Sequence, residues 1–578
     1  MNYSPMRRAF LSVVFASFMC VGSLVAGETA ATPVEFGGKE AAAYVVVPDV
    51  NALFTAVDVL AKQFAPPGQY APGMAKLIVG AQLGDAALDN LGKTPLMLVL
   101  FKLPEGYQMQ PGAPPPMALF MPAIAAQPYD QVFNAKGVSA FENGVLIAAP
   151  TAELLKKAQA MRADYDKLAA AKPATDIRLF ISGASLMDTY GSMLASGLKE
   201  TEKKAIDSIT NEPPPPGVEI KPEMAIKLVK MGLRGVDGLL HQINSMQLDL
   251  KVTPEALTMD MVFAAKEGSI LASFMSNGAA KTDKNLEALV GNGSLAGTTS
   301  MDMVALSAAW KKLVAEVAAN PDYGDLAKNE MVAFMQEALD SVGGAQAFSM
   351  QFSKDGMSQT MAGTVKNPAA YLEMLKKTNA LFDKDSMIGK LYAGMGMTMI
   401  SKFEEKARAY KGVDIARMTM TMDGPMFKGP QKEQMDKMMK PREIAIVKGY
   451  FLSSDKPETL NAMIDMTTSG TFSPNGMTLK SKAAFGEGRQ FYVDYDFLAL
   501  MKAVSADPNN PMGPIFAKLP DGAPVLIAGS MDKGKLQISE QIPLAPIAKM
   551  VKMFMEMGQA MQQGNPVPPP KPTEDGKF

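Results

Sequence analysis

The sequence predicts an α+β fold, with repeated units of antiparallel β-hairpins and amphipathic helices packed on one face of the sheet. Two observations lead to this prediction. Short β-like stretches run repeatedly into a polar or small residue and then into an amphipathic helix. Hairpins in which apolar and polar residues alternate also recur along the chain. Such alternation is typical of antiparallel strands that are half-buried under helices.

The strand-to-helix opening occurs four times. An Asp or Ser follows each strand, and its side-chain oxygen can accept hydrogen bonds from the amides of the first helical turn. The openings are, in chain order, residues 44–49 before a helix over 50–64, residues 177–182 before a helix beginning near Ser185, residues 295–300 with Asp302 before the helix of Trp310, and residues 490–494 with Asp496 before a helix from Phe497.

The hairpin occurs three times. In each copy a turn rich in Pro, Gly, Asp or Lys joins two alternating stretches. The paired stretches are 245–252 with 257–263, 349–352 with 357–365, and 525–530 with 535–541, and a helix follows the third copy from Leu544.

The chain has 578 residues, which is enough for two or more domains. We expect an N-terminal half over 28–285 and a C-terminal half over 286–563, because a stretch with Gly and Asn near 285 precedes the third opening. Residues 564–578 are polar and rich in proline, so we expect a disordered tail.

Residues 1–27 have the three parts of a secretory signal peptide. Arg7 and Arg8 precede an apolar run over 10–26, and Val25 and Gly27 suit cleavage before Glu28. The run is short for a membrane span of about 20 residues, and no later segment is long and apolar enough. We expect a soluble protein that is exported to the periplasm or the exterior. A retained N-terminal anchor and twin-arginine export stay open as alternatives.

Composition narrows the classes of partner. Cys20 is the only cysteine and lies in the signal, so the mature chain has no cysteine. Its context does not match a lipid-acceptor site, because Ser17, Phe18 and Met19 precede it. Lys and Arg number 57 against 59 Asp and Glu, without a long basic block, so we expect no nucleic-acid partner.

The sequence offers little for catalysis. His241 is the only histidine, which excludes a multi-histidine zinc site, and no nucleophile-elbow motif accompanies it. Asp494 and Asp496 lie two apart at a strand end and could form a two-carboxylate hydrolase site, or could cap a helix beside a solvated strand residue. We expect no enzyme and no cofactor, and we assign no catalytic residue.

Methionine is the unusual feature, with 47 residues. Met418, Met420 and Met422 would place three thioether sulfurs on one face of a strand, and such sulfurs suit Cu(I). The same spacing also fills an apolar core, because methionine packs adaptably. These three residues are the candidate metal ligands, with core packing as the alternative.

The strand-to-helix openings, the repeated hairpins and the segment 141–148 before a helix over 152–157 resemble a family of uncharacterised exported bacterial proteins. That family is catalogued as a domain of unknown function. The resemblance implies export and a repeated α+β architecture, and it implies no catalytic residue.

These observations predict a non-enzymatic envelope protein that acts as a scaffold or binding module. The alternatives are a carrier of an apolar ligand, either lipid or peptide, and a Met-rich Cu(I)-binding protein. The expected partner is an unknown protein or apolar ligand in the cell envelope.

Overall fold

The structure is a computed structural model. It describes residues 40–65, 70–77, 88–102, 116–127, 129, 137–171, 174–211, 222–276, 278, 283–319, 330–353, 356–382, 386–394, 397–424, 432–433, 436, 439–472, 476–504, 516–519 and 522–562. The expected signal peptide and the expected C-terminal tail lie outside these residues.

The described residues up to 289 form eight strands and several helices. In order they are β1 (Ala41–Val47), α2 (Val50–Phe64), β2 (Leu96–Phe101), β3 (Met117–Pro122), β4 (Val138–Glu142), β5 (Val145–Ala149), α6 (Ala152–Ala160), α7 (Arg162–Ala171), β6 (Ile177–Ser182), α8 (Gly183–Asn211), α9 (Pro222–Gln242), β7 (Ile243–Val252), β8 (Ala256–Ala265), α10 (Ile270–Met275) and α11 (Lys284–Leu289).

Ten further strands, with their helices, follow among the residues that the structure describes. They are β9 (Leu295–Ser300), α12 (Met303–Ala319), α13 (Glu330–Ser341), β10 (Val342–Ser353), β11 (Gly356–Val365), α14 (Pro368–Leu381), α15 (Met387–Gly394), β12 (Thr398–Tyr410), β13 (Val413–Asp423), β14 (Arg442–Val447), β15 (Tyr450–Ser454), α17 (Pro457–Ser469), α18 (Lys480–Phe485), β16 (Phe491–Tyr495), α19 (Phe497–Val504), β17 (Val525–Asp532), β18 (Lys535–Pro543) and α21 (Leu544–Gln562).

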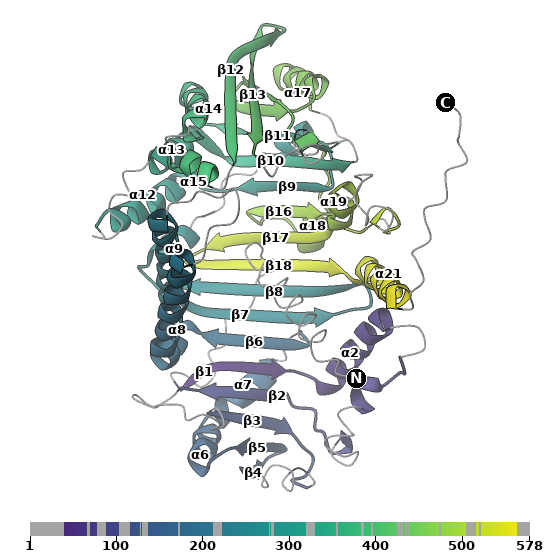
Figure 1. The fold of residues 1–578 in the computed structure, drawn as a ribbon. Helices are drawn as coiled ribbons and strands as arrows, with labels where there is room; N and C mark the ends of the chain where they lie inside the picture. The colour runs from purple at the N-terminus through teal and green to yellow at the C-terminus, as the bar shows by residue number, and fades with distance from the viewer. Residues whose placement is uncertain are drawn as a thin grey trace.

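The 18 described strands form one antiparallel sheet (Figure 1). The strand pairs give the order β4-β5-β3-β2-β1-β6-β7-β8 and then β18-β17-β16-β9-β10-β11-β15-β14-β13-β12. The last of the described strands, β18, therefore joins the strands that precede residue 285 to those that follow it. The α+β class is confirmed, and the division into two domains near residue 285 stays a prediction.

Side chains that pair directly across strands lie on the same face of the sheet. We call face A the face that carries Tyr44 and Leu452, and face B the face that carries Leu248 and Phe451. At one end of the sheet, α6 and α7 cover face A, where Tyr165 stacks on Phe120 with ring centroids 5.2 Å apart.

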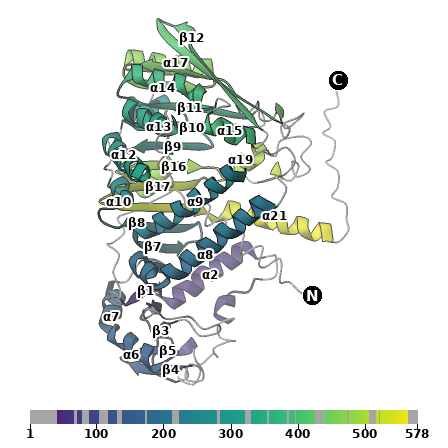
Figure 2. The ribbon, with the colours of Figure 1, turned by 60° about the vertical axis from the view of Figure 1, so that its left-hand side comes forward.

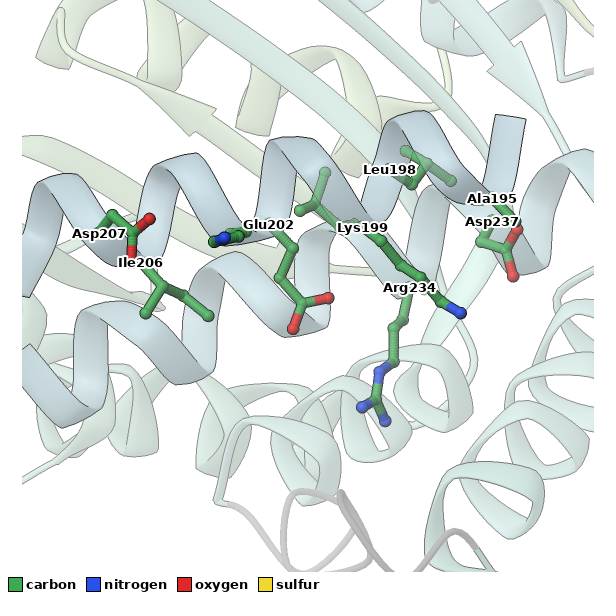
Figure 3. A pocket seen from close by; sticks show the side chains of 10 residues that line it. Ala195, Leu198, Lys199, Glu202, Ile206, Asp207, Arg234 and Asp237 are labelled. Atoms are coloured by element: carbon green, nitrogen blue, oxygen red, sulfur yellow. The ribbon is translucent and has the colours of Figure 1, made fainter. Parts of the chain in front are cut away.

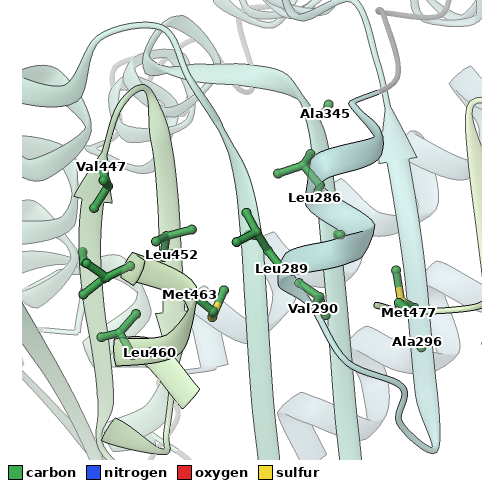
Figure 4. Packing of buried hydrophobic residues seen from close by; sticks show 14 of the residues in the cluster. Leu286, Leu289, Val290, Ala296, Ala345, Val447, Leu452, Leu460, Met463 and Met477 are labelled. Atoms are coloured by element: carbon green, nitrogen blue, oxygen red, sulfur yellow. The ribbon is translucent and has the colours of Figure 1, made fainter. Parts of the chain in front are cut away.

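Helices cover both faces at the other end of the sheet. On face A, Leu460 and Met463 of α17 and Leu289 of α11 pack on the strands (Figure 4). On face B, Tyr371 of α14 stacks on Phe451. The expectation of helices on one sheet face is therefore wrong, because helices that follow neighbouring strands cross to opposite faces.

The predicted strand-to-helix junctions hold in all four places. Asp49 Oδ1 accepts from the amides of Asn51 and Ala52, at 2.8 and 3.1 Å. The corresponding side chains of Ser182, Asp302 and Asp496 accept from first-turn amides in the same way. At each of these junctions the capped helix begins after no more than two residues that follow the strand.

Several helices extend away from the sheet. Figure 2 shows α2, α8, α9 and α21 on the same side of the sheet. Of the helices described, none combines the length and the apolar character that crossing a membrane requires.

Candidate functional site: an apolar strip on the central strands

The six central strands, β6, β7, β8, β18, β17 and β16, carry an apolar row of side chains on face B. Each side chain of this row is half-buried. We call this row the apolar strip, and its members are Leu179, Ile181, Leu248, Met261, Phe263, Leu536, Ile527, Met531, Phe491 and Val493.

The strip is less covered than the part of face B that lies under α14. Ile538 is buried at its centre, at 1% exposure, and the strip residues around it are only partly buried. Farther along face B, Phe451 and Ile444 are buried together with Tyr371 and Leu375 of α14. Face B is therefore sealed under α14 and partly open along the strip, and face-B side chains of the neighbouring strands β1 to β3, such as Val45, Leu98 and Leu119, are half-buried as well.

Face A of the same strands carries several polar and charged side chains that bond to one another. Arg178 of β6 makes a bidentate ion pair with Asp249 of β7, with both nitrogen–oxygen distances at 2.7 Å. Gln247 Nε2 donates to the same carboxylate at 3.1 Å, and Ser539 donates to Asp260. Burial lowers the pKa of Arg178, but the Asp249 carboxylate outweighs it and raises that pKa overall. The charged side chains of Arg178 and Asp249 are therefore paired with each other on face A.

A helical arm flanks the strip at one end of the strands. Helix α8 starts directly after β6, and α9 ends directly before β7. The arm meets the sheet closely at its base, because a Cβ on Gly183 would lie 2.3 Å from the Ile243 carbonyl oxygen. Beyond the base the arm is amphipathic, and Met193, Val236 and Leu239 are 53%, 47% and 47% exposed.

The arm itself carries a cavity of about 560 Å³ between its two helices (Figure 3). Leu198, Ile206 and Leu233 supply the apolar part of its lining. Charged side chains of both signs surround them: Lys199, Glu202, Lys203, Asp207, Arg234 and Asp237. This volume is within the range of small-molecule pockets.

A second cavity, of about 350 Å³, lies on face A between α11, β9, β10 and the segment before β16. It is polar, and Lys482 spans its edge in an ion pair with Glu287 at 2.9 Å. Tyr492, in its lining, donates to the Gly486 carbonyl and accepts from the Arg489 amide. The lining residues are therefore bonded to one another, which favours a structural role.

One charged residue lies among the apolar side chains of face B. Glu540 of β18 is 2% exposed, and its Oε2 has no hydrogen-bond partner among the described residues. Ile527 of β17 lies directly opposite it, and the β8–β18 register places Met259 on its other side. Burial alone raises the pKa of the Glu540 carboxyl to about 7.

His241 lies near the end of α9 with its side chain 54% exposed. Its Nδ1 is 2.8 Å from the Asp237 carbonyl oxygen, one helical turn earlier. No group of three or more His, Cys, Asp or Glu side chains suited to a metal ion occurs among the described residues.

Asp494 and Asp496 cap two different helices. Asp494 is buried and accepts from the amides of Lys480 and Ser481, at 2.6 and 2.9 Å, at the start of α18. Asp496 Oδ1 accepts from the Ala499 amide in α19. Asp494 is thus a buried cap, which differs from the solvated strand residue that the sequence suggested.

The three candidate copper ligands lie on face B of β13. Met418 packs with Phe403 in the apolar cluster under α14, and all three methionines are half-buried. Met420 pairs with Ser401, and Met422 pairs with Met399 of β12. Copper binding stays a prediction, and Cu(I) titration of the triple Met→Leu variant tests it.

Sequence reasoning missed Glu540 and the pairing of Arg178 with Asp249. A signal for Glu540 exists, because Leu536, Ile538 and Ile542 place it in the apolar register of an alternating strand. The partner of Arg178 has no comparable signal, because residues 71 apart meet only when β6 pairs with β7.

Comparisons with known proteins add little. No family model matches the chain, and no curated protein matches it. A solved structure described as "Structure of crystal form IV of TP0453" is similar to 46% of this chain and to 96% of its own length, with 9% sequence identity and a TM-score of 0.18. A likeness this low carries no argument about fold or function.

Proposed function

We propose that this protein is a non-enzymatic, exported binding protein that holds an apolar ligand against the strip on face B. The observation that supports it best is the half-buried state of the ten strip residues. Large apolar side chains at the centre of a sheet normally lie under a helix or a second sheet. A continuous apolar patch that stays accessible is typical of a binding surface.

The ligand class follows from the chemistry of the strip. Leucine, isoleucine, methionine and phenylalanine offer dispersion contacts and almost no hydrogen bonds, so an alkyl chain fits better than a sugar or nucleotide. Burial of apolar area contributes roughly 25 cal/mol per Å², so a long alkyl chain gains several kcal/mol. Methionines such as Met261 and Met531 adapt to chains of different shape.

The proposal also includes a structural repeat: the strands on the two sides of the β8–β18 junction would be two copies of one unit. Strands β1 to β8 and strands β9, β10, β11, β14 to β18 follow the same order outward from the β8–β18 junction, with β12 and β13 added at one edge. Two turns correspond in detail, because Asn143-Gly144 and Lys448-Gly449 both have positive φ. Each turn precedes a five-residue strand and then a helix. The strip would then straddle the junction of two copies.

Nile red binding tests the proposed function. We expect saturable fluorescence enhancement with the wild-type protein, and at least tenfold weaker binding by the double variant Leu248→Asn/Ile527→Asn. The matched control is Ile400→Asn, at a side chain of β12 that is 55% exposed, and it should bind as the wild type does. Absence of saturable binding, or equal binding by the double variant, would contradict the proposal.

A protein partner is the second candidate occupant, since the arm of α8 and α9 exposes Met193, Val236 and Leu239. Native mass spectrometry of protein purified from its own envelope separates the two. A dissociable small mass identifies a carrier, whereas a bound polypeptide identifies a scaffold.

A further inference from the structure

The buried acidic residues of this protein differ in their hydrogen-bond partners. Three acidic residues are buried among those described: Glu443, Asp494 and Glu540. Glu443 receives hydrogen bonds from Arg408 and Arg417, and Asp494 receives two from backbone amides. Glu540 has no such partner, although it is the most deeply buried of the three at 2% exposure.

An unpaired buried carboxyl costs stability, because it loses its water and gains no protein donor. Its position is specific. Glu540 lies on the strand that joins the two parts of the sheet, beside Ile538 and level with Ile527 in the middle of the apolar strip. The other described side chains that these six strands place on face B carry no charge. Glu540 is therefore the one carboxyl group that a ligand on the strip would meet among the described side chains of this face.

We propose that the ligand of the strip is a cationic amphiphile, in which an alkyl body covers the strip and a protonated amine pairs with Glu540. This inference rests on the proposed function and names the ligand class for the same site. An amine supplies the missing hydrogen-bond donors and neutralises the carboxylate, so the pair carries no net charge. A carboxylate ligand would add a second negative charge to an apolar site, and an alcohol would leave Glu540 without a counter-charge.

Methionine side chains of the neighbouring strand β8 lie next to Glu540. Met259 is level with Glu540 on β8, and Met261 of the strip follows it on the same face. Methionine changes rotamer readily and can make room for an ammonium group.

Three ligands of equal chain length test the inference: decylamine, decanol and decanoate, measured by calorimetry at pH 8. We expect the wild-type protein to bind decylamine at least tenfold more tightly than the other two. Glu540→Gln keeps the shape of the side chain and should remove this preference, while its affinity for decanol changes less than twofold. Retained decanol binding also shows that the variant is folded.

The matched control is Glu458→Gln, which makes the same chemical change at an exposed residue of α17 and should keep the preference. Equal wild-type affinities for the three ligands, or an amine preference that survives in Glu540→Gln, would overturn the role of Glu540 and leave the proposed function standing. No binding of any of the three would overturn both.

Discussion

The pKa values of two buried glutamates, Glu443 and Glu540, are shifted in opposite directions. Burial alone would raise the pKa of Glu443, but the hydrogen bonds from Arg408 and Arg417 outweigh it and hold that pKa below its usual value. Glu540 has burial as its only cause of shift, so its pKa rises to about 7. Glu443 therefore stabilises the fold when ionised, and Glu540 favours the fold only while it holds its proton.

The pH dependence of stability tests this for Glu540. Its pKa rises from 4.5 in the unfolded chain to about 7 in the fold, so the folded state binds the extra proton between these values. Relative to Glu540→Gln, the wild-type free energy of unfolding should fall by roughly 3 kcal/mol from pH 4.5 to pH 8. Urea denaturation of both proteins across this range measures the difference. A difference that is constant with pH would contradict the assignment.

Helix α8 of the arm has few buried residues for its length. Only Gly183 and Ser185 of α8 are buried, and both lie in its first turn. The arm is therefore held mainly at its base, where Gly183 touches Ile243, and along the contact between its two helices. We expect the arm to open more easily than the sheet, since local stability follows the number of buried apolar contacts.

Two glycines of α8 should respond oppositely to alanine. Gly183→Ala would place a methyl group 2.3 Å from the Ile243 carbonyl oxygen, so we expect a loss of about 1–3 kcal/mol and faster amide exchange in the arm. Gly197 has open space around its Cβ position, and alanine there should stabilise the helix by about 0.5–1 kcal/mol. Hydrogen exchange and urea denaturation measure both effects. The same change in stability at both positions would contradict the close packing of Gly183 against Ile243.

At the scale of the whole molecule, one strand pair joins the two parts of the sheet. The Ala265 amide donates to the Gly534 carbonyl, and the Leu544 amide donates to the Glu255 carbonyl. In an antiparallel pair, every second residue of a strand bonds to the same neighbouring strand. Ile538 is an even number of residues from both Gly534 and Leu544, so its amide also donates to β8. The two parts of the sheet are therefore coupled through β8 and β18, and the strip lies across this coupling.

A proline at this junction tests the coupling. We expect the wild-type protein to unfold in a single calorimetric transition, and Ile538→Pro to split it into two. Proline removes the amide that donates to β8 and costs about 3 kcal/mol or more. Ile400→Pro is the control, because β12 lies at the edge of the sheet, and it should keep a single transition. A single transition in Ile538→Pro would show that other contacts join the two parts.

Local features of the fold were predictable from sequence. The helix over 50–64 and the strand over 177–182 were expected at the bounds that the structure has. Asp49, Asp302 and Asp496 identified helix starts, because a cap bonds to amides two or three residues away. The position of the candidate site was not predicted, and a carrier of an apolar ligand was one of the alternatives to a scaffold, because alternation is the same for a strand that faces a core and one that faces a ligand.

The sequence alone determined the α+β class and the positions of several strands and helices, since hydrogen bonds of caps and turns and the two-residue period of strands are local. Only the tertiary structure decided the strand order, the pairing of β8 with β18 and the helix cover on both faces. Strand pairing depends on which distant edges meet, and no local pattern specifies that choice. The same long-range pairing buries Glu540 beside Ile527 and leaves the strip half-open, so the candidate site is a product of tertiary structure.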